Sequence, residues 1–281
     1  MDRGRPGIYL LASYPKSGNT WVRALLEAWY QNGAVDINRM IHTTAIMRAQ
    51  LFEDTLDVSP GELTEAEIFR ARPAMLRSLH AESAKADWHK CHDAFLPVPG
   101  GTEALIPPES LAGVILIVRD PRDVAPSLAA HSGLGLDDAI ARMADAEAIL
   151  GAKRRQAQVP QLVSSWSRFY ESWLAAPVLR MEVVRYEDLL ADPRAHLRRI
   201  LALAGLDGGE ERLARAVEAA GFTRLRRQEA EHGFREALPA ASAPFFRQGR
   251  AGAWKNTLSP AQVARLTADH GPAMARFGYA V

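Results

Sequence analysis

The stretch Ser13–Trp21 (SYPKSGNTW) combines residues that can bind an anion, and it lies between two apolar segments. It follows the run Ile8–Ala12 and precedes Val-Arg-Ala-Leu-Leu, the order expected of a strand, a loop and a helix. A loop in this position points backbone N–H groups and the positive end of the helix dipole at a ligand. Gly18 lets a ligand approach the backbone closely. Further donors are the side chains of Ser17, Asn19 and Thr20. The stretch predicts a phosphate-binding loop, although a capped helix without a ligand could use the same residues.

The lysine of this loop is displaced from its place in an ATP or GTP site. In the pattern G-x-x-x-x-G-K-[ST], Gly18 and Thr20 are in register, but Asn19 occupies the lysine position. The only lysine of the loop, Lys16, stands three positions earlier. In ATP- and GTP-binding enzymes the lysine reaches the β- and γ-phosphates, and Ser/Thr holds Mg²⁺. The displacement argues against a nucleoside triphosphate and calls for a different phosphate-like ligand.

Two further segments place arginine where a second anion could bind. In the segment 119–127 (RDPRDVAPS), Arg119 directly follows the apolar run Gly113–Val118, and Ser127 falls in a predicted helix. A guanidinium group offers a planar fork of donors that suits phosphate. The second segment, 246–256 (FRQGRAGAWKN), contains a G-x-x-G followed by Trp-Lys-Asn. Alone, the first string is more often a surface turn with salt bridges, and the lone G-x-x-G carries no meaning.

The segment 88–93 (WHKCHD) offers a base beside a cation. Histidine can accept a proton near neutral pH, which lysine and arginine do not do readily. Two histidines and a cysteine within four positions lack the spacing and the distant fourth partner of a zinc site. A nucleophilic Cys91 would need an adjacent base and a lowered pKa, and no G-x-S-x-G elbow anchors a hydrolase triad. We therefore predict no metal and take His92 as the candidate base, with His131 and His232 as its nearest rivals.

Strands and helices alternate around these segments. The runs Ile8–Ala12, Gly113–Val118 and Val178–Val184 are short and apolar, as expected of strands buried on both faces of a parallel sheet. Helical spacing follows the first loop from Trp21 to Trp29. Asp192-Pro193 and Ser259-Pro260 each supply an N-cap and a first-turn proline for a later helix. The pattern predicts one α/β domain over residues 1–281, with a central, mostly parallel sheet flanked by helices. We expect insertions or lids at about 36–88, 132–175 and 227–246.

The composition sets limits on partners and compartment. A formal charge of +1 gives no overall case for nucleic acid, so an anion site must be local. A single cysteine excludes an internal disulfide framework. The apolar stretch near the amino terminus is too short for a signal peptide, and no run approaches the ~18 residues of a spanning helix. We expect a cytoplasmic protein with no membrane span and no nucleic-acid partner.

Taken together, these segments resemble the cytosolic type of sulfotransferase that uses 3′-phosphoadenosine 5′-phosphosulfate (PAPS). Tyr14–Trp21 is similar to the family loop Y-P-K-S-G-T-T-W and differs from it at Asn19. Segment 119–127 resembles the 3′-phosphate motif R-[DN]-P-[RK]-D-x-x-x-S, and segment 246–256 resembles R-K-G-x-x-G-x-W-K-N. Lys90 and His92 fall in register with the family's K-[TS]-H, although Asp-Ala-Phe follows where Leu-Pro is commonest. The resemblance implies a P-loop NTPase-like fold with a phosphosulfate-binding loop.

The resemblance also implies a role for each candidate residue. The donor is PAPS, the product is adenosine 3′,5′-bisphosphate (PAP), and no metal is required. Lys16 and Lys90 would stabilise charge on the bridging and equatorial oxygens, while His92 would take the proton of the acceptor. The implied nucleotide contacts are Lys16, Ser17, Gly18, Asn19 and Thr20 at the 5′ group, Arg119, Ser127, Arg247 and Gly249 at the 3′-phosphate, and Trp21, Tyr186 and Phe222 at adenine. Each of these three aromatic residues could equally be a core residue.

The acceptor is the least determined part of the prediction. We expect a small molecule with a hydroxyl group, rather than an amine, bound by residues from 36–88, 132–165 and 227–246. Six apolar residues of these regions and their surroundings suggest an acceptor with an apolar body, unless they pack helices: Met47, Leu51, Phe52, Phe69, Phe95 and Phe234. The usual dimer motif K-x-x-x-T-V-x-x-x-E is not matched after Lys255, so the oligomeric state stays open. The alternative functions are a P-loop kinase or NTPase and a non-catalytic nucleotide-binding module.

Overall fold

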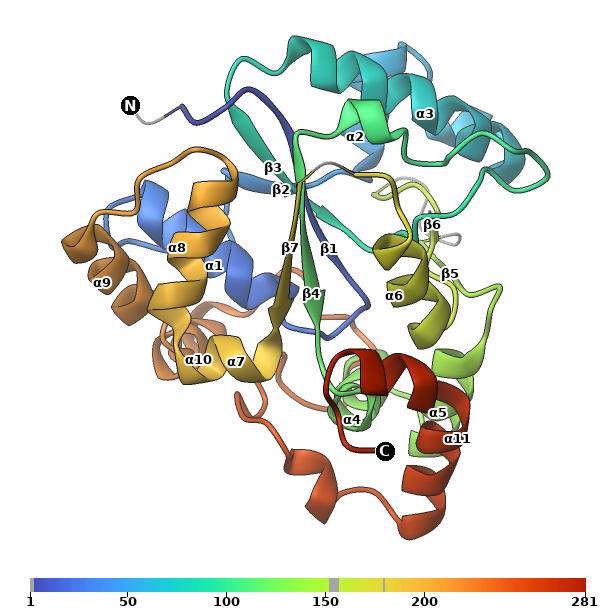
Figure 1. The fold of residues 1–281 in the computed structure, drawn as a ribbon, viewed down its shortest axis with the longest axis vertical. Coiled ribbons are helices and arrows are strands. Elements are labelled where there is room, and N and C mark those ends of the chain that lie inside the picture. The colour runs from blue at the N-terminus through green and yellow to red at the C-terminus, as the bar shows by residue number, and fades with distance from the viewer. Residues whose placement is uncertain (1–2, 152–156, 179) are drawn as a thin grey trace.

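A computed structural model describes residues 3–151, 157–178 and 180–281, and a parallel sheet forms its centre (Figure 1). In the described part, five strands pair in the order β2-β3-β1-β4-β7, and every pairing is parallel. The strands are β1 (Gly7–Ser13), β2 (Thr43–Ala45), β3 (Ala86–Cys91), β4 (Gly113–Val118) and β7 (Met181–Arg185). A separate antiparallel pair joins β5 (Ile149–Leu150) to β6 (Gln161–Leu162).

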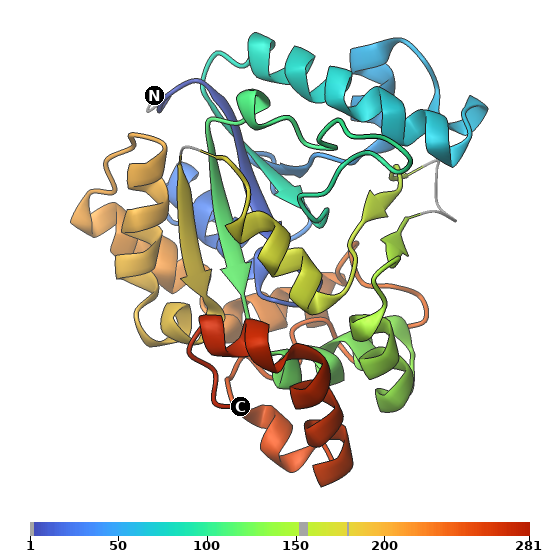
Figure 2. The same ribbon diagram turned by 45° about the vertical axis from the view of Figure 1, so that its right-hand side comes forward.

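Helices cover both faces of the sheet, as Figures 1 and 2 show together. They are α1 (Asn19–Tyr30), α2 (Ala49–Leu56), α3 (Glu65–Glu82), α4 (Pro121–Ser132), α5 (Leu136–Ala144), α6 (Trp166–Leu174), α7 (Tyr186–Ala191), α8 (Pro193–Leu203), α9 (Glu210–Ala219), α10 (Phe222–His232) and α11 (Pro260–Arg276). Short 3₁₀ turns lie at η1 (Pro60–Glu62), η2 (Pro108–Ser110) and η3 (Ala253–Asn256). The predicted α/β class with a parallel sheet is confirmed.

The central strand β1 explains why the sheet needs helices on both sides. Ile8, Leu10 and Ala12 contribute to one apolar core, which α3, α4, α6 and α11 help to build. Tyr9 and Leu11 point to the other face and enter a second core with α1, α8 and α9. Successive side chains of a strand alternate between the two faces, so a strand that is apolar throughout must be buried on both.

The strong sequence patterns predict their elements closely. The runs at residues 8–12 and 113–118 form β1 and β4. Asp192 caps α8 by accepting a hydrogen bond from the backbone N–H of Ala195 at 2.9 Å. Ser259 and Gln262 form a capping box at the start of α11. These predictions are confirmed because apolar runs and caps act over a few residues, within reach of local sequence.

Three strands depart from the predictions. The third predicted strand, 178–184, instead runs over Met181–Arg185, where it pairs with β4 from Val114 onward; Leu179 lies outside the described residues. The strands β2 and β3 carry no apolar run, and the expected insertion at 36–88 contains β2 and the start of β3. Pairing with β1 and β2 holds β3 in the sheet despite its Asp, His and Lys residues. Tertiary pairing therefore overrides weak local propensity here.

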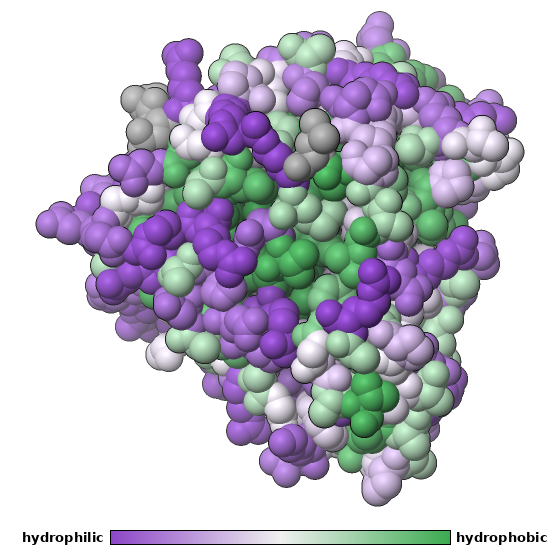
Figure 3. Space-filling model, in the orientation of Figure 1, coloured by the Kyte–Doolittle hydropathy of each residue, from purple (hydrophilic) through white to green (hydrophobic). Residues whose placement is uncertain are grey.

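One face of the molecule is mainly polar. Figure 3 shows hydrophilic residues over much of one face and a group of hydrophobic residues near its centre, over the region of β7 and α6. Most residues of the edge strand β7 are partly exposed. No helix in the described ranges is long and apolar enough to cross a bilayer.

Candidate active site

Residues that follow β1, β3, β4 and β7 line one cavity of about 930 Å³. In open α/β sheets, ligands bind in the crevice outside the carboxyl ends of the strands. All but one of the sequence-predicted site residues line this cavity, and the exception is Ser17. Those that line it are Lys16, Gly18, Asn19, Thr20, Trp21, Lys90, His92, Arg119, Ser127, Tyr186, Phe222, Arg247 and Gly249. The structure thus brings together segments that lie far apart in the sequence.

The glycine of the first loop is required by its surroundings. Gly18 has a φ of 107°, a left-handed conformation, and α1 begins at the next residue. A Cβ atom at this position would lie 2.6 Å from Cδ2 of Tyr186. Because glycine has no side chain, the loop can pass beneath the tyrosine ring and present the start of α1 to the cavity.

Two side chains of the loop hold the fold together. The hydroxyl group of Ser17 is buried and accepts a hydrogen bond from Tyr170 Oη at 3.1 Å. The amide nitrogen of Asn19 donates to the carbonyl oxygen of Leu11 at 2.7 Å and to Ser13 Oγ at 3.1 Å. The Asn19 amide therefore fastens the loop to β1, and the Ser17 hydroxyl fastens it to α6.

Lys16 has a buried Nζ atom with no hydrogen-bond partner among the described residues. Its backbone has a left-handed φ of 68°, a conformation that non-glycine residues adopt mainly at strained, often functional positions. Its Nζ atom lies 3.4 Å from the centre of the Phe245 ring. Burial, followed by the charges of Lys90 and Arg119, lowers the pKa of Lys16 to about 7. An ammonium group held in this way is poised to gain an anion.

A second group of cations is formed by two arginines from the other motifs. Arg119 lies over the Tyr186 ring, with its guanidinium carbon 4.4 Å from the ring centre, and donates to the carbonyl oxygen of Lys16 at 3.3 Å. Burial and the neighbouring charge of Arg119 lower the pKa of Arg247. Within the described residues, neither guanidinium group pairs with an acid. Like charges that face one cavity without a counter-ion are the mark of an anion site.

The carboxyl-terminal loop is fixed over the cavity by Asp123 of α4. Its carboxylate accepts hydrogen bonds from the backbone N–H groups of Gly252 at 2.6 Å and Trp254 at 2.9 Å. Earlier in the loop, Gly249 has a φ of 59°, and a Cβ atom there would lie 2.3 Å from Cδ2 of Phe222. Asp123 thus links the second and third motifs.

The three predicted adenine-contacting residues form part of the cavity wall. The rings of Trp21 and Tyr186 meet edge to face, with centroids 5.9 Å apart. The indole N–H of Trp21 donates to the carbonyl oxygen of Ala220 at 3.0 Å, so this side chain has a structural bond as well. Phe222 packs against Phe246 at 6.5 Å. All three line the cavity while they also contact neighbouring elements.

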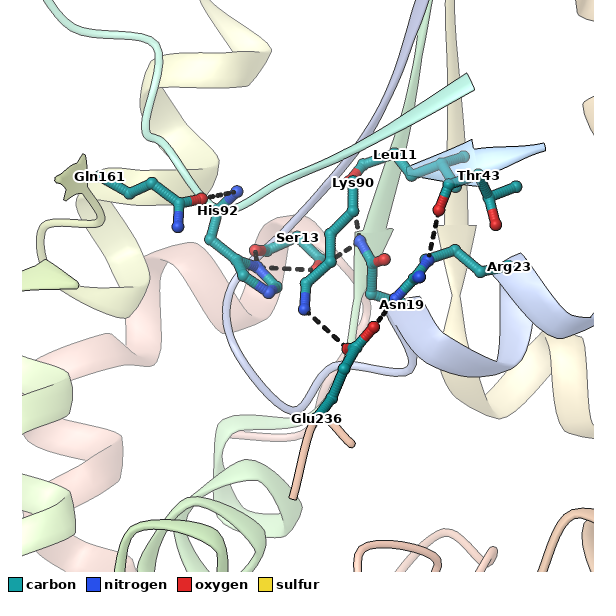
Figure 4. A network of polar contacts seen from close by, with 9 residues as sticks. All are labelled: Leu11, Ser13, Asn19, Arg23, Thr43, Lys90, His92, Gln161 and Glu236. Carbon is teal, nitrogen blue, oxygen red and sulfur yellow. Dashed lines mark hydrogen bonds and ion pairs between the residues drawn. The ribbon is translucent and has the colours of Figure 1, made fainter. Parts of the chain in front are cut away.

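The candidate base is held in one tautomer. His92 Nδ1 lies 2.7 Å from the carbonyl oxygen of Ser13 (Figure 4). A carbonyl oxygen can only accept, so Nδ1 carries the proton and Nε2 keeps its lone pair. Burial and the charge of Lys90 lower the pKa of His92 to about 3. The imidazole is therefore neutral at physiological pH, the form that can accept a proton.

The residues after His92 form a buried support. Arg72 and Asp93 make a two-point ion pair, with distances of 2.6 Å and 3.0 Å, and both side chains are fully buried. Asp93 also accepts a hydrogen bond from the backbone N–H of Leu162 at 2.7 Å. The indole of Trp173 donates to the carbonyl oxygen of Asp93 at 3.0 Å. Asp93, the residue that follows His92, is thus held in place by Arg72, Leu162 and Trp173.

Among the charged cavity residues that the sequence did not indicate are Arg23 and Glu236. Glu236 accepts from Lys90 Nζ at 3.0 Å and from Arg23 Nη1 at 2.6 Å, and Figure 4 shows the three side chains in a row. Arg23 Nε donates to the carbonyl oxygen of Thr43 in β2 at 3.0 Å. Glu236 is partly buried, yet its pKa is lowered because Lys90 and Arg23 stabilise its charge. The sequence could have indicated Arg23, because it stands one helical turn after Asn19 of the loop. Nothing in the sequence indicated Glu236.

The rival residues separate clearly in space. His131 lines the cavity and meets the edge of Phe245, with ring centroids 5.5 Å apart. His232 is exposed and lies outside the cavity lining.

Cys91 is fully buried, and its pKa is raised well above the usual value, so it is no nucleophile. In the described ranges, no three His, Cys, Asp or Glu residues form a group that could hold a metal ion.

The apolar residues that suggested an apolar acceptor do not line the cavity. All six are core or helix-packing residues, so the packing interpretation is correct: Met47, Leu51, Phe52, Phe69, Phe95 and Phe234. Other apolar residues contribute to the wall, among them Met40, Leu128, Ile149, Leu150, Leu238 and Phe245. A helical pattern records that a face is buried, but not which element or cavity covers it.

Comparison with known sequences finds one family. Residues 7–278 match the family model described as the sulfotransferase domain. Sulfotransferase 1A1 of Bos taurus is 27% identical over 290 residues, which cover 96% of this chain and 84% of that protein. Cytosolic sulfotransferase 17 of Arabidopsis thaliana is 23% identical over 279 residues, which cover 94% of this chain and 73% of that protein.

Solved structures share the fold at low identity. The crystal structure of mouse sulfotransferase SULT7A1 complexed with PAP is similar with a TM-score of 0.60 and 18% identity, covering 98% of this chain and 85% of that one. Retinol dehydratase in complex with androsterone and inactive cofactor PAP also gives a TM-score of 0.60 and 18% identity, covering 96% and 81%.

Proposed function

The chain belongs to the sulfotransferase domain family, and we propose that it transfers the sulfuryl group of PAPS to a hydroxyl group of a small molecule. One observation carries the proposal. The cavity contains two groups of cations, and the described residues give neither Lys16 nor the pair Arg119 and Arg247 an acidic partner. PAPS carries a phosphosulfate at one end and a 3′-phosphate at the other. Support also comes from solved relatives that carry PAP.

The nucleotide would span the loop and the arginine pair. Lys16 and the backbone of residues 17–20 would hold the phosphosulfate, since a helix begins there and its first N–H groups lack intrahelical partners. Arg119, Ser127, Arg247 and Gly249 would hold the 3′-phosphate. Trp21, Tyr186 and Phe222 would contact adenine, as the aromatic part of the wall.

The proposed chemistry uses three side chains of the cavity: His92, Lys16 and Lys90. Nε2 of His92 would accept the proton of the acceptor hydroxyl, whose oxygen attacks sulfur while the bond from sulfur to the bridging oxygen breaks. Lys16 would stabilise the charge that develops on the bridging oxygen, and Lys90 the charge on the sulfuryl oxygens. An ammonium group has three donors, so Lys90 can bind an anion without leaving Glu236. Positioning and electrostatic stabilisation would supply most of the rate enhancement.

A kinase or NTPase is the less favoured function. Mg²⁺ in such enzymes is held by a loop hydroxyl and a strand-end aspartate. Thr20 could supply the hydroxyl group, but both carboxylate oxygens of Asp120 are bound by Arg122 at 2.8–3.1 Å. The acid at the end of β4 is therefore occupied by an ion pair.

Ligand-dependent melting tests the nucleotide assignment. We expect PAP to raise the melting temperature far more than AMP or ATP with Mg²⁺, because only PAP offers a 3′-phosphate to Arg119 and Arg247. Arg247→Gln should remove the preference for PAP over AMP. Equal stabilisation by AMP and PAP would refute the 3′-phosphate site. Turnover of PAPS with a panel of hydroxyl acceptors then separates an enzyme from a non-catalytic binding module.

A further inference from the structure

One end of the cavity is used neither by the proposed nucleotide site nor by the candidate base. Its wall contains the β5–β6 pair and the residues beside it. Two arginines also line this end, Arg48 just before α2 and Arg142 in α5. This end belongs to the regions from which the sequence predicts acceptor contacts.

The wall connects the candidate base to both arginines. Gln161 of β6 accepts a hydrogen bond from the backbone N–H of His92 at 3.2 Å, and it pairs in register with Leu150 of β5. At the preceding position of β5, the carbonyl oxygen of Ile149 accepts a hydrogen bond from Arg142 Nη2 at 3.5 Å. The β5–β6 pair is therefore hydrogen-bonded to both His92 and Arg142.

Arg48 flanks the same wall. It forms an isolated antiparallel bridge with Gln158. The backbone around it is fixed by two hydrogen bonds, from Ala49 N to Ala157 O at 3.1 Å and from Val159 N to Met47 O at 3.0 Å. An acceptor lying along this wall with its hydroxyl group at His92 would meet both arginines with its far end.

The two arginines at this end have no paired acid among the described residues, although Arg48 is exposed and Arg142 also borders a second pocket that contains Asp138, Asp145 and Glu147. In the described ranges, neither Arg48 nor Arg142 forms an ion pair with an acid. Glu236 is the one acid among the described lining residues, and Lys90 and Arg23 already bind it. Arg142 is half-buried and meets only a carbonyl oxygen at the limit of a hydrogen bond. A guanidinium group partly removed from water without a counter-ion is stabilised by an incoming oxyanion.

We propose that the acceptor carries an anionic group, a carboxylate or a phosphate or sulfate ester, that pairs with Arg48 and Arg142. The hydroxyl group that receives the sulfuryl group lies at the opposite end of the same molecule, at His92. This inference rests on the proposed sulfotransferase function, because it concerns the acceptor half of that site.

Matched acids and amides test the inference. The probes are hydroxyphenyl alkanoic acids with one to three methylene groups and the primary amides of the same acids. We expect kcat/KM with PAPS to be at least about tenfold higher for the best acid than for its amide, as for hydrogen bonds to a charged group. The difference should lie in KM, because the arginines bind the ground state and the transition state alike.

Arginine variants assign the difference to these two residues. Arg48→Gln and Arg142→Gln should each raise KM for the acid about tenfold and leave KM for the amide unchanged. Arg226→Gln, an exposed arginine of α10 outside the lining, is the matched control. Acids and amides that react equally well, or an acid preference that survives both substitutions, would overturn the proposal.

Equilibrium binding keeps this test apart from the proposed function. The acids and amides are titrated into the protein saturated with PAP, and the double variant Arg48→Gln/Arg142→Gln serves as reference. Acid binding that disappears in the double variant while turnover is absent supports the anionic subsite and counts against sulfotransfer. If the amides are turned over and binding shows no preference for the acids, the result supports sulfotransfer and counts against the anionic subsite.

Discussion

Lys16 allows the binding of the nucleotide to be followed through protons. In the free protein, burial and the charges of Lys90 and Arg119 lower its pKa to about 7. At that pKa about half of the lysine is neutral at pH 7 and about nine tenths at pH 8. The phosphates of PAP bring negative charge to the loop and should return the pKa toward its usual value near 10.4.

The expected signal follows from these fractions. Binding of PAP should take up about 0.5 proton at pH 7 and about 0.9 proton at pH 8. Because the pKa of Lys16 rises when PAP binds, binding takes up protons. The affinity for PAP therefore falls as the pH rises above 7. The dissociation constant of PAP should increase about fivefold from pH 7 to pH 8 and about tenfold from pH 8 to pH 9. The phosphates titrate near pH 6 and contribute little in this range.

Calorimetry in buffers of different ionisation enthalpy measures the uptake directly. The slope of the observed enthalpy against the ionisation enthalpy of the buffer gives the number of protons. Lys16→Arg is the matched control, because a guanidinium group stays charged and should take up none. A slope near zero for the wild-type protein at pH 8 would refute the account, since Lys16 would then be charged before the nucleotide binds.

Four further predictions concern the base, its support, the loop and the need for a metal. His92→Ala should lower transfer by about 10²–10⁴-fold while PAP binding stays close to wild type, and His131→Ala should retain most activity. Because the pKa of His92 is lowered to about 3, kcat/KM should show no loss from this group between pH 8 and pH 5, and a fall centred near pH 6.5 that disappears in His92→Ala would contradict this. Asp93→Ala leaves the fully buried Arg72 without its partner and should cost about 3–5 kcal/mol of unfolding free energy, measured by urea denaturation, whereas an unchanged midpoint would show that the pair is unimportant. Gly18→Ala places a methyl group against Tyr186 and should weaken PAP binding strongly in calorimetry, and near-normal affinity would mean that the loop can shift. Activity measured in EDTA should equal that in buffer, while a loss that Mg²⁺ reverses would favour an NTPase.

Much of the fold could be predicted because its signals are local. The apolar runs at β1 and β4 and the caps of α8 and α11 are read from a few consecutive residues. The α/β class follows from their alternation. The strands β2 and β3 could not be predicted in this way. They have polar sequences, and pairing with strands that are distant in the sequence keeps them in the sheet.

The sequence also indicated which segments meet at the site. Loop residues between β1 and α1, the arginine after β4 and the histidine after β3 all follow strands of one parallel sheet. The carboxyl ends of such strands lie along one edge, so the topology alone places them together. Residue types at these points then indicated an anion and a base.

Only the tertiary structure decided how each of these side chains is used. Ser17 and Asn19 satisfy buried groups of the fold, and the proton of His92 is fixed by the carbonyl oxygen of Ser13. Lys90 is paired with Glu236, a residue 146 positions away in the sequence. Burial and charge depend on neighbours in space, and a sequence records neighbours only along the chain. The sequence by itself therefore determined the fold class and the location of the site, whereas packing determined its protonation states and its free cations.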